Sequence, residues 1–338
     1  MNLHRPVRIG SFETRGNLFL APVAGYSDAA FRSVCADMGC DLAFTEMVSS
    51  EALVRDSRKT EVLLERAGNE QAYAVQLFGA NPDVMAAAAR IVVERWRPAL
   101  LDVNCGCPVP KIVRSGAGSA LMRDLPRMAA IVAVMRDAVD VPVTVKIRLG
   151  WDDGSMNYLE AAAAAVGAGA AAVTLHARTR IQGYSGTVDA GAFGRLAGAV
   201  PVPVFASGDM FEPADALAAL DGSRGTPVAG VMLARGAMGN PFLFARTAAA
   251  LEGRPEPVIT PAMRAAIARR HFGLSLGLYG ERLACAEFRK QACAYLKGTP
   301  GGAALRARAV ACSSAAEYEA FFEAWESAGP AATGSTRA

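Results

Sequence analysis

The residues best suited to chemistry in this sequence lie between Leu100 and Pro110, in the stretch LLDVNCGCPVP. An apolar run that stops at a polar, proline-bounded turn is typical of a buried strand that delivers its last residues into a site. Cys107 lies in this turn, between Gly106 and Pro108. Such loops often present reactive thiols, although an isolated cysteine is more often a small buried hydrophobe. The surrounding residues must decide between the two interpretations.

Polar residues end most of the other apolar runs of the chain as well. In chain order the run ends are Pro22, Glu46, Gln76, Asn104 with Cys107, Lys146, His176, Ser207 with Asp209, and Arg235. Each has an ordinary explanation taken alone, such as a lysine that extends to solvent or a histidine that is hydrogen-bonded in the core. In a parallel barrel, however, the carboxyl ends of all strands meet at one rim, where the active site lies. We therefore expect these side chains to share one site.

The last two run ends have the composition of a phosphate site. Small-residue turns at Ala206–Asp209 and Ala234–Gly236 offer backbone N–H groups, and Arg235 could add a charged contact, although ordinary tight turns are the alternative. A cation such as Lys146 in a barrel mouth is costly unless an anionic group faces it. A flavin meets both requirements, with its phosphate at these turns and Lys146 near the ring edge that becomes negative on reduction. Gln76 would then form a hydrogen bond with the flavin ring.

The elements that must position these residues can be identified from hydrophobic patterns. The apolar runs are Leu18 to Ala21, Leu42 to Thr45, Tyr73 to Leu77, Leu101 to Asn104, Val143 to Ile147, Ala172 to His176, Val204 to Ser207, and Gly230 to Leu233. Helix-opening residues follow several of them, including Asn81 with Pro82, Asp124, and Asn240 with Pro241. Eight continuous apolar runs that alternate with helices predict an α/β fold, a (β/α)8 TIM barrel over residues 1–250.

The composition changes after residue 250. Arg254, Pro255 and Pro257 are typical of a linker, and three helical patterns follow it. The first opens at Thr260 and Pro261, the second runs from Glu281 to Lys297, and the third follows Ser314, which forms a capping box with Glu317. We therefore predict an all-helical domain over residues 251–329 and a disordered tail over residues 330–338.

The charges of the chain are unevenly distributed. The whole chain carries a formal net charge of only +3, but between Arg254 and Arg308 ten basic residues stand against three acidic ones. A basic helical domain beside a mildly acidic barrel is typical of a protein that binds a polyanion. A merely solvated helical face is the alternative.

Other totals restrict the class of protein. A hydrophobic content of 52% in 338 residues supports a large core, and the N-terminal stretch has no apolar signal segment. Seven scattered cysteines do not form a disulfide framework, so we expect a soluble protein of the reducing cytoplasm. We also expect a monomer that does not bind a membrane. The pair Cys105 and Cys107 lacks a second cysteine or histidine pair nearby, and only three histidines are present, so we predict no metal site.

With these residues the sequence resembles the tRNA-dihydrouridine synthases, and most of all the bacterial B subfamily. The matching stretches are RIGSFETRGNLFLAPVAGYSDAAFR, TEMVSS, VQLFGANP, LDVNCGCPVPKIVRSGAGSALM, VPVTVKIRLGW, VTLHARTR, VFASGDM and VMLARGAMGNPFLF. They run in order from Arg8 to about Leu251, and the likeness continues more weakly into LYGERLACAEFRKQACAYL. The resemblance implies an FMN-containing barrel and a helical domain that binds tRNA.

The resemblance also implies roles for individual residues. Flavin contacts would come from Pro22, Val23, Ala24, Gln76, Lys146, His176, Ser207, Gly208, Asp209, Ala234 and Arg235. Cys107 matches the proton donor of the family, whereas Cys105 matches no functional position. The chain departs from the family where Val23 replaces Met, Ser207 replaces Asn and Ala234 replaces Gly. If these contacts are made by backbone N–H groups, Val, Ser and Ala can serve, but a Ser side chain reaches less far than Asn, so flavin affinity is expected to differ from the family norm.

The expected reaction is the reduction of a uracil ring in tRNA. FMN reduced by NADPH would deliver hydride to C6, and Cys107 would protonate C5, because a thiol with an ordinary pKa of about 8.5 is mostly protonated at neutral pH. A uridine stacked in folded tRNA must first be extruded into the barrel mouth. Substrate contacts are expected from Asn104, Lys111, Arg114, Arg178 and Arg180 near the mouth and from Arg289 and Lys290 on the helical domain.

Two other functions fit part of this pattern. A flavin barrel that acts on a small pyrimidine, like the dihydroorotate dehydrogenases, would explain the flavin and the cysteine but gives the basic helical domain no purpose. A tRNA-binding folding chaperone without chemistry would explain the basic domain but not the combination of Cys107, Lys146, His176 and Gln76.

Overall fold

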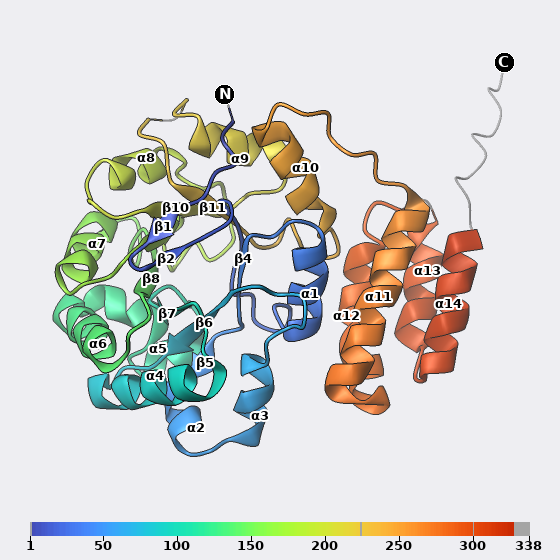
Figure 1. Cartoon of the computed structure of the whole chain (residues 1–338), viewed down its shortest axis with the longest axis horizontal. Helices are drawn as coiled ribbons and strands as arrows, with labels where there is room; N and C mark the ends of the chain where they lie inside the picture. Colours follow the sequence, from blue (N-terminus) through green and yellow to red (C-terminus); the bar gives the residue numbers. More distant parts are fainter. Residues whose placement is uncertain (1, 224, 300, 328–338) are drawn as a thin grey trace.

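Eight parallel strands close into a barrel, and a separate helical bundle packs against one side of it (Figure 1). The structure is a computed structural model that describes residues 2–223, 225–299 and 301–327. The barrel strands are β3 (Leu18–Leu20), β4 (Leu42–Phe44), β6 (Tyr73–Phe78), β7 (Leu100–Asn104), β8 (Val143–Arg148), β9 (Val173–His176), β10 (Val204–Ser207) and β11 (Gly230–Leu233). The predicted TIM barrel is thus confirmed, and each predicted run overlaps one strand to within one or two residues at either end.

Pairing between β4 and β6 closes the barrel, because Ala43 lies opposite Tyr73 in parallel register. The connection between these two strands, residues 45–72, is built from short elements only. It contains β5 (Val48–Ser49), α2 (Ser50–Val54), α3 (Arg58–Glu61) and the 3-10 turn η1 (Val62–Leu64). The short strand β5 pairs with the end of β6 and extends the sheet by one strand at the rim.

Helices surround the barrel. They are α1 (Ala29–Asp37), α4 (Pro82–Trp96), α6 (Leu125–Ala138), α7 (Tyr158–Gly167), α8 (Gly191–Ala197), α9 (Pro213–Leu220) and α10 (Phe242–Leu251). The predicted caps of α4 and α6 are confirmed, because the side chains of Asn81 and Asp124 accept hydrogen bonds from backbone N–H groups in the first turn of each helix. A short helix α5 (Pro110–Arg114) and a 3-10 turn η2 (Gly118–Arg123) follow β7.

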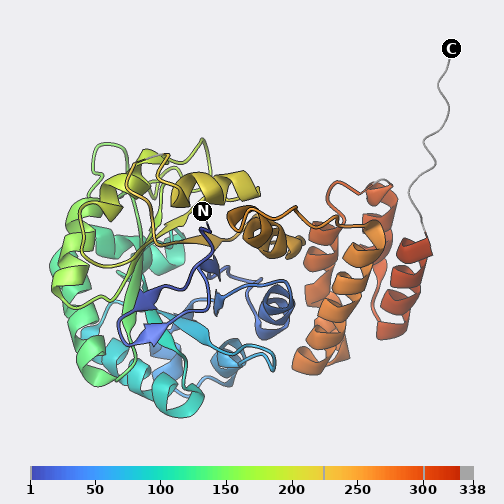
Figure 2. The same ribbon diagram turned by 45° about the horizontal axis from the view of Figure 1, so that its top comes forward.

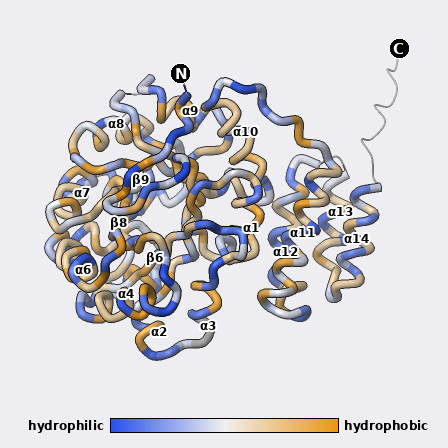
Figure 3. Tube along the Cα trace, viewed as in Figure 1, coloured by the Kyte–Doolittle hydropathy of each residue, from blue (hydrophilic) through white to orange (hydrophobic). Residues whose placement is uncertain are grey.

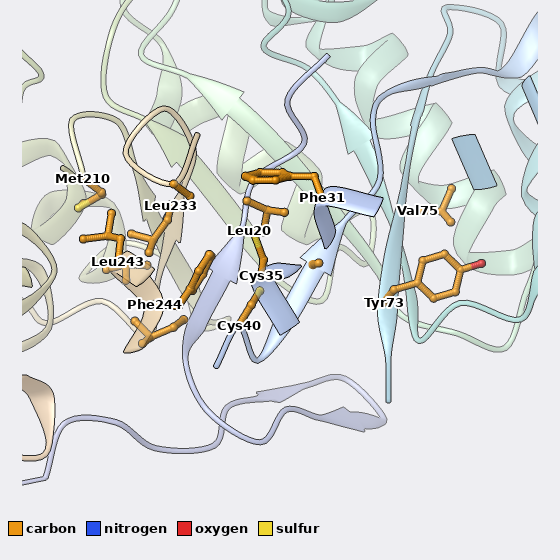
Figure 4. Packing of buried hydrophobic residues seen from close by; sticks show 14 of the residues in the cluster. Leu20, Phe31, Cys35, Cys40, Tyr73, Val75, Met210, Leu233, Leu243 and Phe244 are labelled. Carbon is orange, nitrogen blue, oxygen red and sulfur yellow. The ribbon is translucent and has the colours of Figure 1, made fainter. Parts of the chain in front are cut away.

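The strands bury both of their faces. Along β7, Leu100 belongs to the cluster inside the barrel, while Leu101 and Val103 belong to the cluster between strands and helices. Figure 4 shows part of the outer cluster, in which Leu20 of β3 lies near Phe31 of the first helix. Burial of each such side chain contributes about 1.5 to 3 kcal/mol to stability. Because side chains alternate, residues 102 and 104 of β7 point inward.

The end of the barrel opposite the carboxyl rim is covered by an N-terminal hairpin. Strands β1 (Arg8–Ile9) and β2 (Phe12–Glu13) pair in antiparallel fashion, and Ile9 is fully buried against the interior cluster. A hairpin that covers this end leaves the carboxyl rim as the open end of the barrel.

The second body is a bundle of four helices in the described residues, α11 (Pro261–Tyr279), α12 (Glu281–Tyr295), α13 (Gly302–Ala311) and α14 (Ala315–Ser327). Figure 2 shows that it stands beside the barrel in a second view, and Figure 3 shows the hydrophilic start of the segment that joins α10 to α11. Helix α13 was not predicted, because it buries only Gly302, Leu305 and Ala309 and so has a thin apolar stripe. The predicted tail lies outside the described residues.

Aromatic side chains hold the bundle together and dock it. The rings of Phe272 and Tyr318 lie 4.3 Å apart, and Phe288 packs against both of them. On the barrel side, His271 of α11 stacks on Phe31 of α1 with ring centroids 5.5 Å apart. The bundle is therefore seated on α1, the helix that follows the first strand of the barrel. Among the described residues, no helix combines the length and apolar character needed to span a bilayer.

Candidate active site

The carboxyl ends of the barrel strands surround one pocket, and it collects the residues predicted for the flavin. Its lining includes Pro22, Val23, Ala24, Gln76, Asn104, Cys107, Lys146, His176, Ser207, Gly208, Asp209, Ala234 and Arg235. Strand register explains the convergence, because Asn104 lies opposite Lys146 and His176 opposite Ser207 on neighbouring strands. Residues at the same level of adjacent strands point into the barrel together. Side chains that are distant in sequence thus face one space.

Cys107 lies on the loop after β7 and is held by its backbone. Its N–H donates to Oδ1 of Asn104 at 2.9 Å, and its carbonyl accepts from the backbone N–H and the hydroxyl of Ser119 at 3.0 and 2.9 Å. Gly118 makes this approach possible, because a Cβ there would lie 2.8 Å from the carbonyl oxygen of Cys107. The side chain is 9% exposed, and burial raises the pKa of the thiol above its ordinary value. The thiol is therefore protonated at neutral pH.

A buried carboxylate that the sequence analysis missed lies below this loop. Asp102 is fully buried, and its two oxygens accept hydrogen bonds from Nε2 of Gln76 and from the hydroxyl of Thr144, each at 2.6 Å. Gln76 in turn accepts from Nδ2 of Asn104 at 2.7 Å. The signal was available, because Asp102 is a charge within a buried apolar run and lies two residues before Asn104, on the same inward face.

Lys146 and His176 bring unpaired nitrogen atoms into the pocket. Lys146 has no hydrogen-bond or ion-pair partner among the described residues, and burial together with the charge of Arg148 lowers its pKa to about 8. Nδ1 of His176 is buried without a partner in the same part of the chain. Burial and the nearby cations, Lys146 first among them, lower the pKa of His176 far below its ordinary value, so the ring is neutral. Both groups are free to bind a ligand.

The turns after β10 and β11 are shaped by close approaches that require glycine. A Cβ on Gly208, whose φ is +112°, would lie 2.8 Å from Val188, and a Cβ on Gly236 would lie 2.2 Å from the carbonyl oxygen of Met210. Arg235 follows β11 and pairs with Asp209 at 2.8 Å. Backbone N–H groups and one cation are thus brought together at this side of the pocket, as a phosphate site requires.

Arg178 has a different position from the one we expected at the tRNA surface. Its side chain is buried, pairs with Asp209 at 2.5 Å, and donates to the carbonyl oxygens of Ser185 and Gly186. Although burial of Asp209 opposes the effect, the hydrogen bonds and charge of Arg178 and the charge of Arg235 lower the pKa of Asp209. Because its donors are occupied inside the protein, Arg178 is placed to hold Asp209 rather than to contact tRNA.

The remaining predicted substrate residues lie outside the pocket lining. Lys111 and Arg114 are exposed on α5, immediately after the Cys107 loop, and Arg180 stacks on the ring of Trp151 at 4.7 Å. Arg289 donates to the carbonyl oxygen of Cys312 at 3.2 Å and so anchors α12 to the end of α13.

Lys290 of the helical domain also lies close to a barrel loop. Its ammonium group lies 5.7 Å from the centre of the Tyr26 ring and pairs with Glu287 at 2.5 Å. Tyr26 follows the pocket-lining segment that ends at Ala24. Lys290 therefore stands beside the mouth of the barrel.

Two further residues of the mouth were missed from sequence. Arg148 is buried and donates to the carbonyl oxygens of Gly106 at 2.8 Å and of Thr179 at 3.0 Å, so it ties the Cys107 loop to the loop after β9. Arg148 lies two residues after Lys146 in β8, so its side chain lies on the same face of the strand, and this spacing could have identified it from the sequence. Tyr184 is 60% exposed at the rim, with the guanidinium of Arg235 at 4.7 Å from its ring centre. No group of three metal-binding side chains was found in the described part of the chain.

Comparison with known proteins identifies the family of this chain. The family model for dihydrouridine synthase (Dus) matches residues 19–328. The chain is 46% identical over 328 residues to the probable tRNA-dihydrouridine synthase of Treponema pallidum, an alignment that covers 94% of this chain and 95% of that protein. It is 38% identical over 305 residues to tRNA-dihydrouridine synthase B of Pseudomonas putida, with 89% of each chain covered. Because the family model spans most of the chain and these relatives align over nearly their whole lengths, the chain belongs to the dihydrouridine synthase family.

Proposed function

We propose that this protein is a tRNA-dihydrouridine synthase, which reduces the C5–C6 double bond of specific uridines in tRNA with FMN as cofactor and NADPH as reductant. The names of its relatives support the reaction and the substrate. The observation that carries the proposal is the convergence of a protonated thiol, Cys107, with the unpaired nitrogens of Lys146 and His176 in one pocket. A proton donor facing groups that suit an electron-rich ring is what such a reduction needs.

The residues present fit an FMN molecule. Gly208 and Gly236 line the pocket, where the backbone of their turns would bind the phosphate, and Arg235 supplies a cation with 36% of its side chain exposed. Lys146 and the orphaned Nδ1 of His176 would face the ring system. The chemistry supplied by FMN in this pocket would be the transfer of a hydride to the uracil ring. Val23, Ser207 and Ala234, which depart from the family pattern, line the same pocket, and the backbone N–H of Val23 donates to the hydroxyl of Ser27 at 2.9 Å.

The chain itself supplies the proton. Cys107 holds a proton on its sulfur because burial raises the pKa of the thiol, and it would donate this proton to C5 of the uracil ring. The resulting thiolate would regain a proton from water before the next turnover. Lys146 would meanwhile stabilise the negative charge that develops at the edge of the cofactor.

The basic helical domain would hold the tRNA. Exposed cations in the described residues lie on α12 and just after it, at Arg282 and Lys297, and on α13, at Arg308, while Lys290 stands beside the barrel mouth. Lys111 and Arg114 on α5 would contact phosphates near the extruded uridine, and Arg180 would act at the same rim. Extrusion of a stacked base costs a few kcal/mol, which these contacts must offset. All seven cysteines are free, which suits a reducing compartment, and we place the reaction in the cytoplasm.

One experiment separates this function from the two alternatives. The purified protein should absorb in the flavin bands, and anaerobic addition of NADPH should bleach them. Unmodified tRNA should then restore the absorbance with formation of dihydrouridine, while orotate should not. Reoxidation by orotate alone would identify a small-pyrimidine reductase, and a colourless protein that binds tRNA would identify a binding protein without this chemistry. Either result overturns the proposal.

A further inference from the structure

A continuous chain of hydrogen bonds runs from Asp102 to the backbone of Cys107. Asp102 accepts from Nε2 of Gln76 at 2.6 Å, and Oε1 of Gln76 accepts from Nδ2 of Asn104 at 2.7 Å. Oδ1 of Asn104 then accepts from the backbone N–H groups of Cys107 at 2.9 Å and of Gly106 at 3.2 Å. Asp102 is fully buried in the middle of β7 and takes part in no step described above. A buried carboxylate is costly, so its retention calls for a purpose.

The carboxylate of Asp102 determines which end of each amide side chain donates and which end accepts along this series of hydrogen bonds. Amide side chains can turn by 180° with little change of shape, which exchanges their donor and acceptor ends. An ionised carboxylate only accepts, so Gln76 must direct its NH2 group to Asp102 and its oxygen to Asn104. Asn104 must then direct its NH2 group to Gln76 and its oxygen to the Cys107 loop. Only in this direction does the loop find an acceptor for its two N–H groups.

Neighbouring strands make the arrangement rigid. Gln76, Asp102 and Thr144 lie opposite one another in the parallel register of β6, β7 and β8. The second oxygen of Asp102 accepts from the hydroxyl of Thr144, so the carboxylate cannot rotate without loss of a hydrogen bond. The chain of bonds therefore begins at a group fixed by the barrel wall and ends at the loop that presents the thiol.

We propose that Asp102 is a positioning residue, which sets the direction of the hydrogen bonds through Gln76 and Asn104 and thereby fixes the backbone of Cys107. The inference rests on the proposed function for the role of Cys107 as proton donor. A proton donor must lie within about 3 Å of the atom that it protonates, and misplacement by about 1 Å can cost two orders of magnitude in rate. Loss of the carboxylate should therefore lower the turnover number and leave tRNA affinity unchanged.

The test compares Asp102→Leu with Thr144→Val in the flavin-loaded full-length protein. Asp102→Leu removes the acceptor for Gln76 and keeps the branched shape of the side chain, whereas Thr144→Val keeps that acceptor and removes only the other hydrogen bond to the same carboxylate. Hydrogen–deuterium exchange is measured at the amides of Gly106 and Cys107. We expect exchange at least tenfold faster in Asp102→Leu and a smaller increase in Thr144→Val, which loosens the carboxylate without reversing the direction of the hydrogen bonds. The turnover number for dihydrouridine formation should fall at least tenfold in Asp102→Leu and less in Thr144→Val, with KM for tRNA within twofold of wild type in both.

Two results would overturn the proposal: unchanged exchange in folded Asp102→Leu, or faster exchange with an unchanged turnover number. If Asp102→Leu does not fold, Gln76→Met interrupts the chain at its next link and should give the same rise in exchange. If wild-type protein forms no dihydrouridine, the proposed function fails. The exchange comparison, which needs no tRNA and no NADPH, then decides alone whether Asp102 fixes the loop.

Discussion

The hydroxyl of Tyr279, near the end of α11, donates a hydrogen bond to Oδ2 of Asp28 at 2.9 Å. The other oxygen of Asp28 accepts from the backbone N–H of Phe31 at 2.8 Å and caps α1. One carboxylate therefore both starts the first barrel helix and receives the helical domain. Burial and the charge of Asp28 raise the pKa of Tyr279, so the hydroxyl stays a donor. This bond helps to set where the basic domain stands relative to the pocket, since α1 follows the loop that carries Val23 and Ala24.

Replacement of Tyr279 by Phe tests this docking interaction. We expect the variant to lose about 1.5 to 3 kcal/mol of unfolding free energy, because the hydrogen bond that it removes has a carboxylate acceptor. Urea-induced unfolding measures the difference. Tyr26→Phe is the control, since no hydrogen bond to the Tyr26 hydroxyl was found in the described residues, and it should change stability by less than about 0.5 kcal/mol. Equal stabilities of the two variants would show that the Tyr279 hydroxyl does not hold the domains together.

Cys107 and Cys105 offer a comparison of two thiols that are two residues apart. Cys107 lines the pocket, whereas Cys105 is fully buried in the outer cluster, and burial raises its pKa well above the ordinary value. Cys107→Ala should keep bound flavin and NADPH oxidation but lower the rate of dihydrouridine formation by about 10² to 10⁴, the usual contribution of a general acid. Cys105→Ala should form dihydrouridine at the wild-type rate. Full activity of Cys107→Ala would remove this thiol from the mechanism.

The sequence was sufficient to locate the strands and the strand-end residues that were predicted to line the pocket, because both depend on local patterns. An apolar run gives the strand, and its last polar residue lies at the rim by the geometry of any parallel barrel. The partners of a side chain across the barrel depend instead on register. Asp102 bonds to residues 26 and 42 positions away, and no spacing along the chain reveals that these three strands lie side by side at that level.

Arg178 shows the same limit of local pattern for charged residues. A guanidinium just past a strand end is expected to face solvent, yet this one is buried among loop carbonyl oxygens and Asp209. The acceptors come from a loop whose path depends on Gly186, which has a φ of +64°. A basic residue near a site can therefore shape the protein instead of binding the substrate, and only the course of the neighbouring loop distinguishes the two.

The buried carboxylate of Asp102 predicts a pH dependence of stability. Burial, partly offset by the hydrogen bonds from Gln76 and Thr144, raises its pKa from 3.8 to about 6. Between these values the folded protein binds a proton at Asp102 that the unfolded chain releases, so the contribution of Asp102 to stability falls as pH rises from about 4 to about 6 and is constant outside this range. The Asp102→Asn variant has no carboxyl group at this position and so does not lose this stability. Its free energy of unfolding relative to wild type should therefore rise by about 3 kcal/mol between pH 4 and pH 6, because a pKa difference of 2.2 corresponds to about 3 kcal/mol.

Urea unfolding of both proteins at a series of pH values measures this difference. Asp209→Asn serves as the control, because the pKa of Asp209 is lowered from 3.8 and its contribution to stability is lost only as pH falls below about 4. The stability of this control relative to wild type should be constant between pH 4 and 6. A constant difference for Asp102→Asn over the same range would contradict the raised pKa of Asp102.

The basic helical domain predicts a salt-dependent affinity for tRNA. Arg289→Ala combined with Lys290→Ala should reduce the slope of log affinity against log salt by about one for each phosphate that the protein no longer neutralises. The control removes the same charge from the opposite end of the barrel, with Arg5→Ala and Arg8→Ala in the exposed N-terminal segment. Because Arg289 also bonds to the carbonyl oxygen of Cys312, circular dichroism must first show that the bundle remains folded. Identical slopes for the two double variants would mean that tRNA is bound elsewhere on the protein.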